Sequence, residues 1–219
     1  AQIVPMVFMM LLFGSTIGTA NQLLMSTIEE KSNKVMEVLL SAVSPLQLMA
    51  GKIVGQGLAG LIIVGVYSSL GIVTLFALKS LDLVTTAQLA ALGVYFFMAY
   101  FMVAALMAAV GSAVSDLREA NSLVAPVMML LMVPWLLWMP ISQAPNGLIA
   151  TIFSYLPPAI PFVMIVRVAA EEPVPGWQVA ISIVWGFACT FGMIWVASRI
   201  FRVGVLMTGK PPSPLEMLK

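Results

Sequence analysis

Five long runs of this sequence carry no charged residue, and they determine what the chain can fold into. The runs cover residues 1–28, 53–78, 83–115, 120–166 and 173–198. A helix needs roughly 20 apolar residues to cross a bilayer, so each run is long enough for a span. None of the runs alternates apolar and polar residues as the strands of a transmembrane barrel do. We therefore predict an all-α integral membrane protein with one domain over residues 1–219.

The predicted spans are five helices, and the lysines and arginines decide between five and six. With a single span in the run 120–166, eight of these basic residues lie on one side of the membrane and two on the other. With two spans there, the split becomes five to five. Basic residues concentrate on the cytoplasmic side, so we predict five spans, an outer N-terminus and a cytoplasmic C-terminus. The spans are expected at about 3–25, 53–78, 89–112, 122–140 and 177–199.

The composition excludes several classes of function. Only 9% of the residues are charged and the net charge is +1, which argues against a nucleic-acid partner. The chain has no histidine and a single cysteine, Cys189, so one chain cannot build a disulfide framework or a cysteine-based metal site. We predict no catalytic residue and no metal ligand.

The segment 141–176 is predicted to return within the outer side of the membrane. Pro157, Pro158 and Pro161 interrupt any single straight helix there, and two short helices would fit. Because unpaired backbone is not tolerated in lipid, the segment must pack on protein or line water. Arg167 within it is either an anchor at the membrane surface or a substrate contact.

The loop 26–52 is the most polar segment between the spans, with six of the nineteen charges. Ser26 and Glu29 fit a capping box, and Ser44 and Gln47 fit a second one with Pro45 as the first helical residue. The loop is therefore predicted to hold two short helices, the first at about 27–41, with Glu30 and Lys34 paired across one turn. A helix lying on the membrane usually has a basic polar face, whereas this one mixes acids and bases. A protein partner is the better interpretation.

Polar residues also cluster inside the first predicted span. They are Ser15, Thr16, Thr19, Asn21 and Gln22. Such residues either line a pathway or form hydrogen bonds to neighbouring helices, and the sequence leaves both interpretations open.

Three segments together resemble a known family over nearly all 219 residues. The stretch EEKSNKVMEVLLSAVSPLQLMAGKIVG at 29–55 closely resembles the loop between the second and third spans of ABC-2-type permeases, most like the sodium-export and drug-export branch. The segment 155–167 resembles the outer re-entrant segment of that family, and 199–213 resembles its C-terminal ending. Family members normally have six spans, with a large outer domain after the first. On this resemblance the chain corresponds to the part from the second span onward.

The resemblance implies an exporter in the plasma membrane of a bacterium or archaeon. Two permease chains, identical or different, would pair in the lipid bilayer around a pathway, with ATPase subunits bound below. ATP and Mg would belong to the ATPase, and this chain would hold no cofactor. The loop 26–52 would then be a cytoplasmic coupling loop. Its expected residues for contact or orientation are Glu29, Glu30, Lys31, Lys34 and Glu37, with Ser44 and Pro45 shaping the corner.

Other functions fit the residues less well. Gly204-x4-Gly209-Lys210 imitates a phosphate-binding loop, but Pro211 replaces the required serine or threonine, so ATP hydrolysis is expected on another chain. An intramembrane protease of the common types needs a histidine as ligand or base. A non-catalytic channel or assembly protein is the main alternative to the exporter, and a bound ATPase would distinguish the two.

Overall fold

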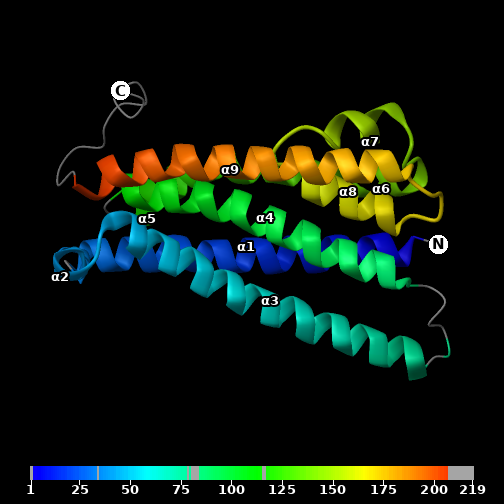
Figure 1. The fold of residues 1–219 in the computed structure, drawn as a ribbon, viewed down its shortest axis with the longest axis horizontal. Helices are drawn as coiled ribbons and strands as arrows, with labels where there is room; N and C mark the ends of the chain where they lie inside the picture. Colours follow the sequence, from blue (N-terminus) through cyan, green and yellow to red (C-terminus); the bar gives the residue numbers. More distant parts are fainter. Residues whose placement is uncertain (1, 34, 78, 80–83, 115–116, 207–219) are drawn as a thin grey trace.

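The computed structural model describes residues 2–33, 35–77, 79, 84–114 and 117–206. Within these residues the chain forms nine helices and no β-strand (Figure 1). In chain order they are α1 (Ile3–Ser32), α2 (Val35–Ala42), α3 (Pro45–Ala77), α4 (Thr86–Ala113), α5 (Leu117–Leu136), α6 (Trp138–Gln143), α7 (Leu148–Phe153), α8 (Ile160–Ala169) and α9 (Gly176–Leu206). The predicted all-α class is confirmed.

Five helical stretches in the described part are long and apolar enough to cross a membrane. They are Ile3–Ser32, Gln47–Ala77, Thr86–Ala113, Arg118–Gln143 and Gly176–Ile200. Each overlaps one of the predicted spans, and the predicted number of five is confirmed. The chain is therefore a multi-pass membrane protein.

The long helices alternate in direction along one bundle (Figure 1). α1, α4 and α9 run one way, whereas α3 and α5 run the other way. One end of the bundle, the α2 end, holds α2 with the end of α4, the start of α5 and the last turns of α9. The opposite end, the α8 end, holds the start of α1 together with α6, α7 and α8. The connections from α1 to α3 and from α4 to α5, which the basic-residue count assigns to the cytoplasmic side, thus both lie at the α2 end.

The run 120–166 contains one span, as predicted. α5 ends at Leu136, and α6 resumes after a single residue. The break follows from Pro140, which lacks the N–H that would bond to the carbonyl of Leu136. α8 has ten residues and is only about 15 Å long, too short to cross a bilayer.

In the segment that follows α6, α8 packs on protein, which is one of the two predicted environments, whereas only Ala150 of α7 is buried. α7 and α8 are the two expected short helices. Nearly every residue of α8 is buried, because α8 packs against α1, α4 and α6. Its backbone is thereby separated from lipid.

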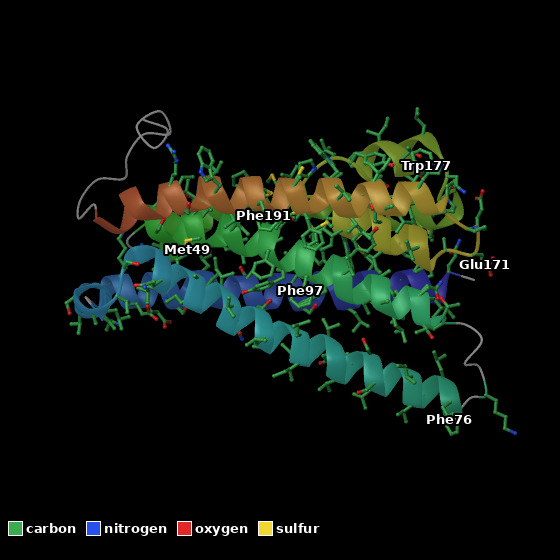
Figure 2. The ribbon with its side chains drawn as sticks, viewed as in Figure 1. Met49, Phe76, Phe97, Glu171, Trp177 and Phe191 are labelled. Carbon is green, nitrogen blue, oxygen red and sulfur yellow. The ribbon has the colours of Figure 1, made fainter. Side chains whose placement is uncertain are left out.

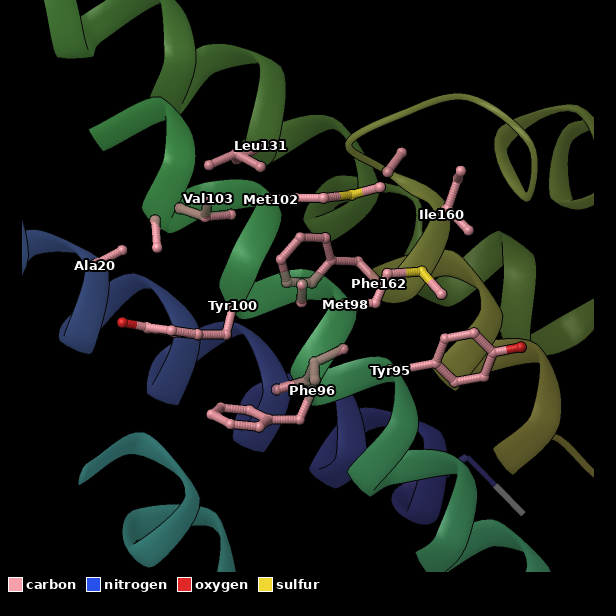
Figure 3. Close-up of a cluster of buried hydrophobic side chains, with 14 of the residues drawn as sticks. Ala20, Tyr95, Phe96, Met98, Tyr100, Met102, Val103, Leu131, Ile160 and Phe162 are labelled. Atoms are coloured by element: carbon pink, nitrogen blue, oxygen red, sulfur yellow. The ribbon is translucent and has the colours of Figure 1, made fainter. Parts of the chain in front are cut away.

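The core of the bundle lies around α4. Figure 3 shows Tyr95 on one side of α4 and Phe96 and Tyr100 on the other, all directed away from Met102. All four side chains are fully buried, and α4 packs against α1, α8 and α9. Phe96 and Tyr100 stack with ring centroids 6.0 Å apart. α4 is therefore the central helix on which the others are assembled.

Helix α3 lies at the edge of the bundle and diverges from it toward the α8 end (Figure 1). Where α3 does touch α4, the contact depends on Gly57. A Cβ atom there would lie 2.8 Å from Cε1 of Tyr100. Tyr100 in turn donates a hydrogen bond to the Ile53 carbonyl at 2.7 Å. The missing side chain thus allows the ring of α4 to reach the backbone of α3.

Large apolar side chains cover the outside of the long helices. Figure 2 shows Phe76 at the end of α3 and Phe191 on α9, and both are mostly exposed. Further exposed examples on α3 include Leu58 and Ile62. Soluble monomers rarely expose apolar patches of this extent, so these faces are suited to contact with lipid or with another span.

The predicted helix starts within the loop 26–52 are partly wrong. α1 is continuous to Ser32, so residues 27–32 extend a span instead of opening a separate helix. Ser26 does not cap a helix, because its hydroxyl donates to the Leu23 carbonyl at 3.1 Å, as a serine inside a helix commonly does.

The second capping box is present, and it begins a longer helix than expected. The Ser44 backbone N–H donates to Oε1 of Gln47 at 3.0 Å, and the Gln47 N–H donates to the Ser44 hydroxyl at 3.3 Å. Pro45 is the first residue of α3, as predicted, but α3 runs on for 33 residues as a span. The loop therefore holds one short helix of its own, α2.

Candidate functional site

The connection between α1 and α3 is held by a long-range ion pair. Nζ of Lys52 lies 2.6 Å from Oε2 of Glu30, and both side chains are partly buried. Glu30 belongs to the last turns of α1, and Lys52 lies two turns into α3. The predicted partner of Glu30, Lys34, lies outside the described residues. The pairing of Glu30 across to α3 was missed, because no local sequence spacing reveals it.

Lys31 joins the same turn of α1 to other helices. Its ammonium donates a hydrogen bond to the Ser112 carbonyl at 2.7 Å, near the end of α4. Glu119, in the first turn of α5, interacts electrostatically with the same ammonium. Lys31 therefore faces the bundle, whereas the neighbouring Glu29 is exposed.

The remaining predicted loop residues have different positions. Ser44 caps α3, and Pro45 begins it, although the side chain of Pro45 is outside the described structure. Glu37 lies within α2, and the placement of its side chain is likewise outside the described structure. The structure thus brings Glu30 and Lys31 to the bundle and leaves Glu29 at the surface.

Helix α2 has an exposed apolar face and a cleft beside it. Val38 is 71% exposed, and Val35 is also exposed. The cleft has a volume of about 470 Å³. Its lining comes from α2, α3 and the end of α1 and includes Leu39, Val43, Leu48 and the Glu30–Lys52 pair. This part of the molecule combines an apolar surface with nearby charges.

The five polar residues of α1 do not act as one group. Ser15, Thr16 and Thr19 are buried, Asn21 is half-buried and Gln22 is exposed. Ser15 donates to the Leu11 carbonyl, and Thr19 donates to the Ser15 carbonyl at 2.7 Å. The hydroxyls of Ser15 and Thr19 therefore bond to carbonyls of their own helix.

Three of those five residues line a groove between α1 and α3. The groove has a volume of about 540 Å³ and contains Ser15, Thr19 and Gln22, with Gly14 and Gly18 on the same wall. A second hollow of about 370 Å³ shares Val7, Leu11 and Tyr67 with it and continues toward the α8 end. Thr16 and Asn21 do not line either hollow. The groove therefore supplies polar groups over only part of its length.

Arg167 has a role that the sequence did not reveal. It is 0% exposed, so the expectation of a side chain anchored at the membrane surface is wrong. Its Nε donates to the Pro145 carbonyl at 2.6 Å and its Nη1 to the Ser154 hydroxyl at 2.7 Å. Its Nη2 donates to Oε1 of Gln178 in α9. Arg167 thus fastens α8 to the preceding turn and to the start of α9.

Comparison with known proteins identifies the family. The model of the ABC-2 family transporter protein matches residues 1–199. The uncharacterized protein YhaP of Bacillus subtilis (strain 168) is 29% identical, over 95% of this chain and 53% of the relative. The uncharacterized protein MJ1024 of Methanocaldococcus jannaschii is 28% identical, over 94% of this chain and 51% of the relative.

The chain spans about half the length of the curated relatives that it matches. No solved structure matches it. The family match covers all five membrane-spanning stretches almost completely. It agrees with the resemblance carried by the loop 29–55. The chain belongs to the ABC-2 transporter family and is a membrane permease component.

Proposed function

We propose that this chain is the membrane-spanning subunit of an exporter and that a separate ATPase subunit docks on the α2 connection. ATP and Mg would be held by that ATPase, and its closing would move the spans. A ligand or partner can shift a conformational equilibrium only through contacts that differ between the two states. α2 is the element best placed to make such contacts.

The carrying observation is the length of the helices on either side of α2. α1 has 30 residues and α3 has 33, which corresponds to about 45–50 Å each. The hydrocarbon core of a bilayer is only about 30 Å thick. The charged turn with Glu29, Glu30 and Lys31 lies directly before α2. A turn with three charges is more stable in water than in lipid. The adjoining α2 should therefore lie outside the bilayer, where a protein partner can reach it.

The orientation that we propose puts α2 in the cytoplasm and the α8 end outside. Lys31, Lys52, Arg118 and Arg199 belong to helix segments at the α2 end. Lys79 and Arg167 belong to the opposite half. This distribution favours a cytoplasmic α2 end. The membrane would be the plasma membrane of a bacterium or archaeon, since YhaP and MJ1024 come from such organisms.

The transport pathway in this proposal runs beside α1, where a second permease chain, identical or different, completes it. Ser15, Thr19 and Gln22 would offer hydrogen bonds to the substrate from the groove between α1 and α3. Thr16 and Asn21 stay predictions for this role. The assignment to the sodium- and drug-export branch rests on the loop 29–55 alone.

The first test is purification of the tagged chain from its native membranes, followed by an ATPase assay on the eluate. We expect an ATPase to elute with the unmodified chain. Glu29→Lys together with Val38→Asp alters exposed positions beside and on α2 and should remove that ATPase. Glu171→Lys, an exposed carboxylate near the α8 end, is the matched control and should retain it. A chain that elutes without ATPase would contradict the proposal and favour a channel or assembly protein.

A further inference from the structure

Two adjacent residues at the end of α1 reach in different directions. The Glu30 carboxylate lies 2.6 Å from the ammonium of Lys52 in α3. The Lys31 ammonium lies 2.7 Å from the Ser112 carbonyl near the end of α4. Successive residues of an α-helix are about 100° apart around its axis, so one turn can hold neighbours on two sides.

The contact with α4 and α5 has a packed base. A Cβ atom on Gly111 of α4 would lie 3.3 Å from Cδ1 of Leu24 and 3.3 Å from Cβ of Thr27. Leu24 and Thr27 are both buried in α1, about two turns and one turn before Lys31, respectively. Beyond this close approach, Glu119 of α5 adds its charge to the surroundings of Lys31. The last turn of α1 is thus packed and hydrogen-bonded against α4 and electrostatically linked to α5.

The chain leaves this turn directly into α2. Only residues 33 and 34 separate α1 from α2, and only residues 43 and 44 separate α2 from α3. The Ser44–Gln47 capping box fixes the entry into α3. A displacement of α2 is therefore applied at once to the ends of α1 and α3, which are already joined by Glu30 and Lys52.

We propose that Glu30 and Lys31 are positioning residues that join the last turn of α1 to α3, α4 and α5, so that movement of α2 displaces these four helices together. This inference rests on the proposed docking of an ATPase at α2. It gives Glu30 and Lys31 a role different from the ATPase contact expected from the sequence. The partner would touch the exposed side of the connection, and these two residues would pass the movement inward.

Lys31 makes a directed hydrogen bond to one backbone carbonyl, that of Ser112. Its ammonium bonds to a backbone carbonyl near the end of a helix, where carbonyls lack partners within the helix and cations are favourable. Methionine fills a similar volume without a donor, whereas arginine keeps both the charge and the donors. Lys31→Met and Lys31→Arg therefore separate the bond from the bulk of the side chain.

The test uses the complex of the chain with its ATPase in lipid nanodiscs. A Cys189→Ser background removes the native thiol, and spin labels replace two exposed side chains near the α8 end, at Phe76→Cys of α3 and Trp177→Cys of α9. Because α9 lies outside the four joined helices, this distance reports their movement relative to the rest of the bundle. The distance distribution is measured without nucleotide and with ATP plus vanadate. We expect a nucleotide-dependent shift with native Lys31, its loss in Lys31→Met and its return in Lys31→Arg. Lys79→Met, at an exposed lysine far from α2, is the control and should keep the shift.

The ion pair provides an independent arm that does not depend on how well Lys31→Met folds. Glu30→Lys alone should lose the shift, and Glu30→Lys combined with Lys52→Glu should regain it. A full shift in both Lys31→Met and Glu30→Lys would overturn the inference while leaving ATPase docking intact. Failure of the docking itself would give a different result. The chain with native Lys31 would then elute without ATPase and would show no shift in the distance.

Discussion

Arg167 of α8 donates a hydrogen bond from Nη2 to the side chain of Gln178, in the first turn of α9. The same guanidinium also holds the Pro145 carbonyl and the Ser154 hydroxyl. A guanidinium offers five N–H donors in a fixed planar arrangement, which suits three acceptors that lie on different segments. One side chain therefore connects the turn after α6, the end of α7, α8 and α9.

We expect Arg167→Met to lower stability strongly. The substitution leaves neutral buried acceptors without a donor, and a buried acceptor left unsatisfied typically costs about 1–3 kcal/mol. Arg167→Lys should lie between Arg167→Met and the unmodified chain, because an ammonium cannot reproduce the fork. Intrinsic tryptophan fluorescence during heating in detergent measures the change. Arg118→Met, at an exposed arginine of α5, is the control, and an equal loss there would contradict the structural role of Arg167.

The Glu30–Lys52 pair should contribute a modest coupling energy. Exposed pairs are typically worth about 0.2–1 kcal/mol, and partial burial of both side chains favours a value of about 1 kcal/mol. Glu30→Gln, Lys52→Gln and the double variant form a double-mutant cycle, measured by thermal unfolding at low and high salt. A coupling energy near zero at low salt would mean that the pair does not hold α1 to α3.

Local signals in the sequence predicted much of the fold. The uncharged runs predicted five spans, and Ser44, Pro45 and Gln47 predicted the start of α3, because capping involves residues only three apart. The same rule failed at Ser26, where the apolar contacts of α1 continue through Leu24 and Ile28. Burial of that face keeps the helix intact, and the serine bonds to its own helix instead.

The contacts of the candidate site were harder to predict. The sequence predicted a pair of Glu30 with Lys34, which lies outside the described residues, but it did not predict the pair of Glu30 with Lys52. Lys31 bonds to Ser112, which is 81 positions away in sequence. Such contacts depend on how helices pack, and no periodicity in a single sequence encodes them. Arg167 was misjudged for the same reason, because its acceptors lie on three separate segments.

Gly57 should tolerate an added methyl group poorly. In Gly57→Ala the new Cβ would lie 2.8 Å from Cε1 of Tyr100, and relief of this clash would disturb the bond from Tyr100 to Ile53. Overpacking of this kind typically costs about 1–3 kcal/mol, which exceeds the gain of up to about 1 kcal/mol from replacing glycine in a helix. The thermal unfolding temperature should therefore fall.

Gly55 provides the matched control for that substitution. It lies in the same helix, and nothing lies within 4 Å of a Cβ atom built there. Gly55→Ala should therefore leave the unfolding temperature unchanged or raise it slightly. Equal effects of the two substitutions would show that helix propensity, and not the approach of α3 to Tyr100, governs this contact.

The proposed orientation predicts which engineered cysteines react from outside the cell. In a Cys189→Ser background, Lys79→Cys should react with a membrane-impermeant maleimide in intact cells, because residue 79 is exposed after α3 and lies toward the α8 end. Ser41→Cys, at an exposed position of α2, should react only after the membrane is opened. The two positions are separated by α3, which is longer than a bilayer is thick, so they should give opposite patterns. Labelling of Ser41→Cys but not Lys79→Cys in intact cells would invert the topology, place α2 outside and exclude docking of a cytoplasmic ATPase there.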